Sequence, residues 1–234
     1  MNSARSRRRW WRAVCALAAS AARGADAWAW EGGWLRAAQR CPSPNFGPRP
    51  TGATPVLAVL HSISLPPGRY GGPAIARFFT NRLGAAGHPF FAQIAGLQVS
   101  AHFLVRRDGR ILQFVDVAER AWHAGASCWR GLANRNDDSV GIEIEGLEGR
   151  PFTAAQYHAV AGLLRQLVRR WPLAEVVGHE HIAPLRKRDP GPGWRWRRLA
   201  QRLQGLPLAV TPATASAAEL RALAAAESAK SPRG

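Results

Sequence analysis

The stretch Val56-Leu57-Ala58-Val59-Leu60-His61 decides the fold class of this chain. A short, continuous apolar run of this kind is typical of a strand buried on both faces of a sheet. His61 stands where such a strand emerges from the sheet, so its imidazole is expected to reach a surface site. The commoner arrangement for a lone histidine is a hydrogen-bonded ring without a metal.

Outward from this strand, the chain alternates between strand and helix patterns. An Asp-Gly turn at Asp108 predicts a hairpin. Thr153 is suited to cap a long amphipathic helix that covers one face of the sheet, and Pro73 to open a shorter one. We therefore predict an α/β fold, a single domain with a mixed central β-sheet flanked by helices. The expected elements are strands at 56–60, 99–105, 111–117 and 139–144, and helices at 74–80, 153–171 and 194–203.

The length and composition indicate one domain with an extension at each end. The chain has 234 residues, of which 47% are hydrophobic, which is enough for one well-buried core. Residues 1–30 are predicted to be a basic, alanine-rich extension or leader. The folded domain is expected at 31–204, and residues 205–234 to be a low-complexity tail, either a frayed helix or disordered.

The net charge of +17 is partly local, because residues 1–30 hold six arginines against Asp26. The remaining excess of positive charge lies largely in residues 80–110 and 163–202. A solvated basic face accounts for it, and attraction to an anionic ligand is the alternative. No nucleic-acid-binding motif accompanies the charge, so specific nucleic-acid binding is not expected.

The N-terminal segment bears on location. Ser6-Arg7-Arg8-Arg9-Trp10-Trp11 precedes a weakly apolar run, and Ala25-Asp26-Ala27 resembles a cleavage site, as in a twin-arginine export signal. We favour a dispensable extension. No stretch reaches the ~18 apolar residues of a transmembrane segment. Three cysteines without CxxC spacing favour a reducing compartment. We expect a cytoplasmic protein, or a periplasmic one if the segment is a functional export signal.

Histidines and carboxylates supply candidate metal ligands. His61, His179 and Asp189 together offer two imidazoles and one carboxylate, which leave a fourth position on zinc open, as hydrolysis requires. His179 and His181 share a face if the segment is extended, so either could bind metal. Asp189 lies in a turn-rich loop, where an Asx turn with a solvated carboxylate is the alternative.

Two glutamates stand close together in the strand predicted at 139–144 and its continuation. Glu143 and Glu145 project to one face, while Ile142 and Ile144 fill the other. Two such carboxylates repel each other unless a cation or water separates them, and zinc, Lys187 or an arginine could do so. A carboxylate beside the attacking water is the usual general base in metal-assisted amide hydrolysis. The alternative is a half-exposed strand with two solvated glutamates.

Several motifs occur in order along the chain. They include Pro42-Ser43-Pro44-Asn45-Phe46, Leu60-His61-Ser62, Ala121-Trp122-His123-Ala124-Gly125, Gly141-Ile142-Glu143-Ile144-Glu145-Gly146, Gly178-His179 and Asp189-Pro190-Gly191-Pro192. With these motifs the chain resembles the AmpD-type zinc amidases, which are N-acetylmuramoyl-L-alanine amidases acting on 1,6-anhydromuropeptides. Phage-lysozyme-like amidases and peptidoglycan recognition proteins belong to the same superfamily. The resemblance covers about residues 31–204 and implies that they form a zinc amidase catalytic domain.

The resemblance implies a role for each matched position. His61, His179 and Asp189 would bind Zn2+, at one edge of the sheet surface, with water or substrate as the fourth ligand. Glu143 would take a proton from the attacking water and then serve the leaving amine. Lys187 would stabilise the oxyanion that forms in the transition state. The scissile bond would be the amide joining the lactyl group of muramic acid to L-alanine.

Some positions lie outside this set or depart from the family's pattern. The resemblance leaves His181 without a role. Ser62 stands where an asparagine is usual, and Gln98 where an arginine is expected, so substrate affinity or preference can differ. Ser62, Trp122 and His123 are candidate substrate-binding residues. For Trp122 the alternative is a tryptophan buried against the sheet.

We therefore expect an N-acetylmuramoyl-L-alanine amidase, a zinc-dependent hydrolase of peptidoglycan recycling. It would cleave the amide bond between (1,6-anhydro-)N-acetylmuramic acid and L-alanine. The alternatives are an exported amidase on intact peptidoglycan and a noncatalytic muropeptide-binding module. The expected partner is an anhydromuropeptide substrate. We expect no specific nucleic acid, no transmembrane segment and a monomer.

Overall fold

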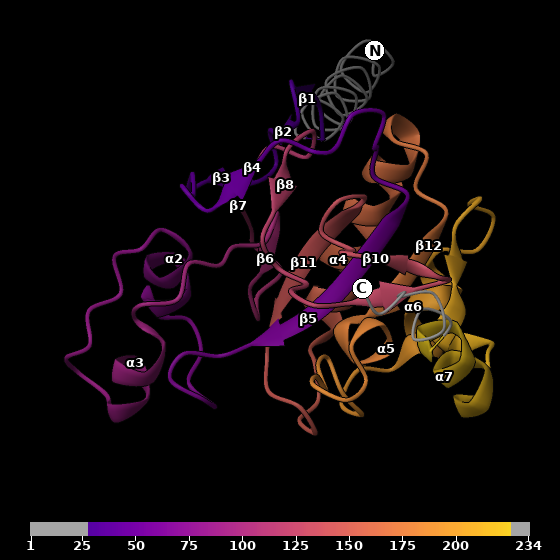
Figure 1. Ribbon diagram of the computed structural model, residues 1–234. Helices are drawn as coiled ribbons and strands as arrows, with labels where there is room; N and C mark the ends of the chain where they lie inside the picture. The colour runs from indigo at the N-terminus through magenta and orange to yellow at the C-terminus, as the bar shows by residue number, and fades with distance from the viewer. Residues whose placement is uncertain (1–27, 226–234) are drawn as a thin grey trace, which may run out of the picture.

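The structure is a computed structural model that describes residues 28–225. Residues 1–27 of the predicted leader, which include Cys15, and the end of the predicted tail lie outside these residues. The centre is a seven-stranded mixed sheet in the order β13-β12-β5-β11-β6-β7-β3 (Figure 1). Strands β6 and β7 pair antiparallel, and the other neighbours pair in parallel. The strands are β3 (Gln39–Arg40), β5 (Leu57–Ile63), β6 (Phe103–Val105), β7 (Ile111–Gln113), β11 (Ser139–Glu145), β12 (Glu175–Gly178) and β13 (Ala209–Val210).

The two longest strands, β5 and β11, form the middle of the sheet. Their parallel register runs from Leu57 opposite Ser139 to Ile63 opposite Glu145. The predicted strand at 56–60 therefore continues for three more residues, and His61 lies inside it rather than after its end. The extension exists because the backbone pairing with β11 continues beyond the apolar run.

The predicted hairpin is present but shorter at both outer ends. Gly109, with φ of +87°, takes the left-handed conformation that the Asp-Gly turn requires. His102 N–H donates to the Gly141 carbonyl of β11 (3.0 Å), and Phe114 N–H donates to the His102 carbonyl (2.9 Å). These bonds continue the contact beyond the strand ends, but the strands themselves contain only 103–105 and 111–113.

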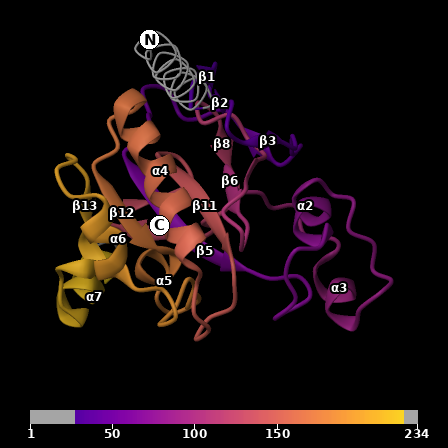
Figure 2. The ribbon, with the colours of Figure 1, turned by 180° about the vertical axis from the view of Figure 1, so that it is seen from behind.

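Helix α4 (Ala154–Arg170) covers one face of the sheet, as predicted (Figure 2). Thr153 caps it with a reciprocal capping box that includes Gln156. Leu163 and Leu164 pack with Ile142 in the main core, and α6 (Trp196–Arg202) lies beside α4. Within the described part of the chain, no helix is both long and apolar enough to cross a bilayer.

Shorter elements surround the opposite face and the ends of the sheet. Helices α2 (Ala74–Phe79) and α3 (Pro89–Ile94) contribute to a second apolar cluster at one end (Figure 1). Helices α5 (His179–Ile182) and α7 (Ala217–Ala225) lie at the other end. The remaining elements are β1 (Trp30–Glu31), β2 (Trp34–Leu35), β4 (Phe46–Gly47), β8 (Arg120–Ala121), β9 (Cys128–Trp129), β10 (Leu132–Ala133) and η1 (Thr211–Ala213).

Part of the stretch that the sequence assigns to the tail joins this architecture. Strand β13 pairs in parallel with β12, and α7 packs Leu220 and Leu223 against a third apolar cluster. The carboxylate of Glu175 accepts bonds from Trp129 Nε1 (3.0 Å) and from the Thr211 hydroxyl. These contacts tie residues 209–225 to the edge of the sheet.

Candidate active site

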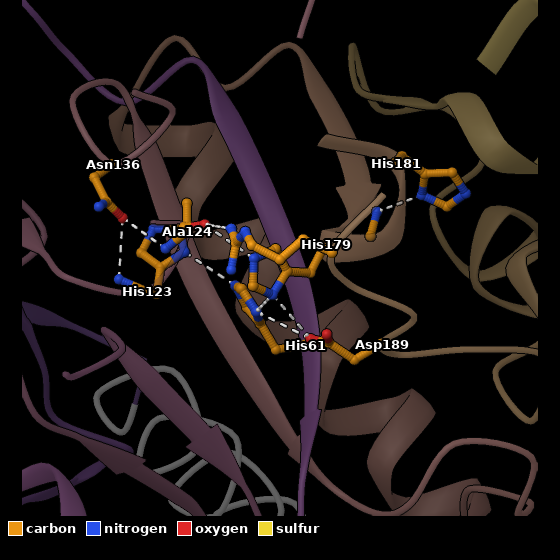
Figure 3. A network of polar contacts seen from close by, with 9 residues as sticks. His61, His123, Ala124, Asn136, His179, His181 and Asp189 are labelled. Atoms are coloured by element: carbon orange, nitrogen blue, oxygen red, sulfur yellow. Dashed lines mark hydrogen bonds and ion pairs between the residues drawn. The ribbon is translucent and has the colours of Figure 1, made fainter. Parts of the chain in front are cut away.

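His61, His179 and Asp189 converge on one point beside the sheet (Figure 3). One ligand atom from each residue lies within 4.8 Å of the others. His61 Nδ1 is 2.9 Å from His179 Nδ1 and 3.2 Å from Asp189 Oδ2. His179 Nδ1 is also 3.2 Å from Asp189 Oδ2. The structure thus brings together the three side chains that the sequence singles out as ligands.

Strand pairing places the two histidines next to each other. The parallel register sets Gly178 of β12 opposite Leu60 of β5, so the residues that follow them are neighbours. Gly178 also leaves room for the loop that carries Asp189, because a Cβ at this position would lie 2.8 Å from Pro190 Cδ. The loop carrying Asp189 folds back onto α5, where Glu180 N–H donates to the Asp189 carbonyl (2.8 Å).

The protonation states of this cluster suit a cation. Burial, reinforced by the neighbouring His179, lowers the pKa of His61 to about 4. Burial acts to raise the pKa of Asp189, but its close contacts with His179 and His61 outweigh this effect and hold the pKa below its usual range. A neutral imidazole and an ionised carboxylate are the forms that bind metal. The donor set therefore fits a divalent metal ion.

The outward-facing ring nitrogens of both histidines also have partners. His179 Nε2 lies 3.0 Å from the Ala124 carbonyl oxygen, and His61 Nε2 lies 2.9 Å from His123 Nδ1. The other nitrogen of His123 is 3.1 Å from Ser139 Oγ. Burial lowers the pKa of His123 well below its ordinary value. Ser139 is a site residue that the sequence analysis missed, because no local pattern connects it to His123.

His181 takes a different position. Its Nδ1 accepts a hydrogen bond from Gly178 N–H (2.8 Å), and its ring packs against Trp196 with the centroids 5.5 Å apart. It lies outside the cluster of ligand atoms. The sequence spacing allowed either His179 or His181 to bind a metal. In the structure only His179 points toward the cluster.

Glu143 lies beside the cluster, and one oxygen of its carboxylate is free of hydrogen bonds to the described residues. It stands opposite His61 in the register of β11 and β5, and its Oε2 is buried and unpaired within residues 28–225. Burial, reinforced by Asp189, raises the pKa of Glu143 well above its usual range, and Lys187 acts against this shift. A buried carboxylate with a free oxygen and a high proton affinity is suited to accept and return a proton.

Glu145, two residues further along β11, is neutralised instead. Its carboxylate accepts bonds from Arg106 Nη1 (2.8 Å), Gly71 N–H (2.7 Å) and Arg107 N–H (3.2 Å). The sequence analysis named zinc, Lys187 or an arginine as a cation that could separate Glu143 from Glu145. In the structure an arginine, Arg106, pairs with Glu145. The partner could not be identified from the sequence, since Arg106 and Glu145 meet only through the pairing of β6 with β11.

A cavity of about 350 Å³ opens onto this group of residues. Glu143, Lys187 and the three clustered side chains line it, together with Ser62, Trp122 and His123. The hydroxyl of Ser62 is buried and has no hydrogen-bond partner in the described range. The eight residues to which the sequence analysis gave a catalytic, metal-binding or substrate-binding role therefore border one cavity.

Comparisons with known proteins agree with this arrangement. Residues 52–192 match the family described as N-acetylmuramoyl-L-alanine amidase, a span that contains His61, His179 and Asp189. The chain is 50% identical over 170 residues to the 1,6-anhydro-N-acetylmuramyl-L-alanine amidase AmpD of Escherichia coli (strain K12), covering 72% of this chain and 93% of that protein. The protein of the same name from Haemophilus influenzae is 42% identical over 171 residues, covering 72% and 93%.

Solved structures give the same result for the fold. The crystal structure of a selenomethionine AmpD derivative has a TM-score of 0.74 and 47% identity, covering 75% of this chain and 99% of that one. The solution structure of Citrobacter freundii AmpD has a TM-score of 0.56 and 45% identity, covering 81% and 98%. The predicted mixed sheet with flanking helices in one domain is thereby confirmed.

Proposed function

The chain belongs to the family of N-acetylmuramoyl-L-alanine amidases, and we propose that it is a zinc enzyme of peptidoglycan recycling. Its reaction is the hydrolysis of the amide bond between 1,6-anhydro-N-acetylmuramic acid and L-alanine. The observation that carries the proposal is the convergence of His61, His179 and Asp189 beside Glu143 in one cavity. The name of the E. coli relative supports the choice of an anhydromuropeptide as substrate.

The donor set fits zinc in particular. Two imidazole nitrogens and one carboxylate are a common set of protein ligands in catalytic zinc sites, which keep a fourth position open. The three ligand atoms lie within 4.8 Å of one another, and the cavity opens onto them. Zinc bound there would supply Lewis-acid activation of the amide carbonyl and of water.

Glu143 carries the proton in this proposal. Its buried carboxylate takes a proton from the attacking water as the water oxygen bonds to the carbonyl carbon. The same proton then passes to the nitrogen of L-alanine as the carbon–nitrogen bond breaks. The products are the lactyl carboxylate of the sugar and a peptide with a free amino group. The unpaired Oε2 and the raised pKa of Glu143 support this role.

Lys187 and two further residues act on the substrate. Lys187 borders the cavity, and its ammonium group would offer positive charge to the carbonyl oxygen as negative charge develops there. The buried, unpaired hydroxyl of Ser62 can bind a polar substrate group, and Trp122 supplies an apolar wall. Both ring nitrogens of His123 face protein groups, so we propose a positioning role for it instead.

We also propose that the enzyme is cytoplasmic, since recycling uses small muropeptides rather than intact wall. We propose in addition that it is a monomer. The alternative export signal lies in residues 1–27, outside the described range. Fractionation of cells producing the full chain tests the location. Activity in the periplasm with a shortened N-terminus would make intact peptidoglycan the substrate. Light scattering after size exclusion tests whether the mass is that of one chain.

The deciding experiment is mass spectrometry of an anhydromuramoyl tripeptide incubated with the zinc-loaded protein. Release of free tripeptide by wild type, and its loss in Glu143→Ala or after chelation, would support the amidase and its base. A zinc-loaded wild type that leaves the substrate intact would overturn the proposal. Calorimetric binding of the uncleaved substrate would then identify a noncatalytic muropeptide-binding module.

A further inference from the structure

The two histidines of the metal cluster are oriented in the same way. Each turns Nδ1 toward the point shared with Asp189. Each turns Nε2 outward to the segment after β8, where His61 meets His123 Nδ1 (2.9 Å) and His179 meets the Ala124 carbonyl (3.0 Å) (Figure 3). One short segment therefore supplies the outer partner of both rings.

The outer partner of His61 is unusual because it can either donate or accept. A carbonyl, such as that of Ala124, only accepts and so holds His179 with its proton on Nε2. A histidine ring carries one proton when neutral, on either nitrogen. The tautomer of His61 therefore depends on the tautomer of His123, and this in turn depends on what His123 meets at its far side.

At the far side, His123 Nε2 meets Ser139 Oγ (3.1 Å). The Ser139 hydroxyl is also hydrogen-bonded to the Arg135 carbonyl. Since that carbonyl can only accept, the Ser139 proton points to it, and Ser139 Oγ is left to accept from His123 Nε2. His123 Nδ1 is then unprotonated and accepts from His61 Nε2, which leaves His61 Nδ1 free of a proton.

The opposite order of donors would block the cluster. If Ser139 donated to His123, then His123 would donate from Nδ1 to His61, and the proton of His61 would sit on Nδ1. A protonated Nδ1 cannot bind a metal. This order would also leave the Arg135 carbonyl without its donor, so the structure favours the first order.

The surrounding backbone is built to hold the His123 ring in place. A Cβ at Gly141 would lie 2.4 Å from Cγ of His123, so only glycine at that position of β11 leaves room for the ring. Asn136 Oδ1 accepts from the backbone N–H groups of His123 (3.0 Å) and Ala124 (2.8 Å). The segment therefore has both a fixed position and a fixed ring.

We propose that His123 and Ser139 are positioning residues, which form a hydrogen-bond relay from the Arg135 carbonyl that holds His61 with Nδ1 free to bind the metal. This inference rests on the proposed function, because it takes the cluster to be a zinc site. Partners of this kind orient metal-binding histidines, and their loss typically weakens metal binding by about 10- to 100-fold.

The test compares zinc affinities, measured by competition with a chromophoric chelator at constant pH. Ser139→Ala and His123→Leu should bind zinc about 10- to 100-fold more weakly than wild type. His123→Asn should recover much of the loss, because its Oδ1 can accept from His61 at the place of Nδ1. Ser43→Ala is the matched control, since it removes another buried hydroxyl that donates to a backbone carbonyl, that of Phe79, and bonds no member of the relay.

Nitrogen-15 NMR of the imidazole rings gives a second readout that needs no variant. In the zinc-loaded wild type, His123 should be neutral with its proton on Nε2. A proton on His123 Nδ1, or equal zinc affinities of Ser139→Ala and Ser43→Ala, would overturn the relay. If the wild type binds zinc tightly and shows this tautomer but cleaves no muropeptide, the relay stands and the proposed function fails.

Discussion

Glu143 of β11 lies directly opposite His61 of β5 in the parallel pair at the centre of the sheet. Residues opposite each other on neighbouring strands project to the same face, so the proposed base and the proposed ligand border one cavity. Leu60 and Ile142, which precede them, fill the opposite face against α4. The separation of base and ligand is therefore set by paired backbone rather than by a loop, which favours a rigid site.

Replacing Glu143 by glutamine tests the base without changing the size of the side chain. We expect kcat for the anhydromuramoyl tripeptide to fall by about 10²- to 10⁴-fold, because the amide cannot accept the proton. KM and zinc content should change little, since Glu143 is not among the clustered ligands. Steady-state kinetics and metal analysis check this. Glu31→Gln, an exposed carboxylate on β1, is the control, and near-normal kcat in Glu143→Gln would exclude the role.

Removal of the metal should lower stability. Zinc that binds only the folded protein adds about 2.7 kcal/mol to the free energy of unfolding when its free concentration is 100 times Kd. Urea unfolding with buffered zinc and with chelator measures the difference. Asp189→Asn should lose most of it, because the ionised carboxylate of the cluster is removed. Asp108→Asn, at an exposed turn, should keep it, and an equal zinc effect in both variants would contradict the ligand assignment.

Arg106→Met should destabilise the fold by about 3–5 kcal/mol, because it leaves the Glu145 carboxylate buried without its cation. The double variant Arg106→Met with Glu145→Gln should regain a large part, since glutamine carries no charge and can still accept from Gly71 N–H. Chemical unfolding of both variants measures this. A double variant no more stable than the single one would show that the buried charge is not the cause.

Burial, reinforced by Arg49, lowers the pKa of His102 to about 3. In the unfolded chain its pKa is near 6.5, so between these values the unfolded state binds the proton and the folded state does not. Stability should therefore fall as pH falls through this window, by about 1.4 kcal/mol per pH unit from this group. Urea unfolding in chelator from pH 6.5 to 4.5 should give a shallower slope for His102→Asn than for wild type. Equal slopes would contradict the shift.

Local sequence patterns predicted the strands and helices in which apolar side chains recur with the period of a strand or of a helix. Strand β11 follows the alternation of Ile142 and Ile144 with Glu143 and Glu145. Helix α4 begins after Thr153 as predicted, because its cap and its apolar stripe are local features. The hairpin and β5 differ in length from their predictions, since their ends are set by hydrogen bonds to partners distant in sequence.

The sequence by itself determined the fold class, the family resemblance and a set of candidate ligands and bases. Only the tertiary structure separated His179 from His181. In an extended segment both would share a face, but the chain turns into helix α5 at residue 179, and residues two apart in a helix diverge. Only strand pairing identified Arg106 as the partner of Glu145, and only the fold brought Ser139 to His123. These contacts depend on strand register, which joins residues that no local pattern connects.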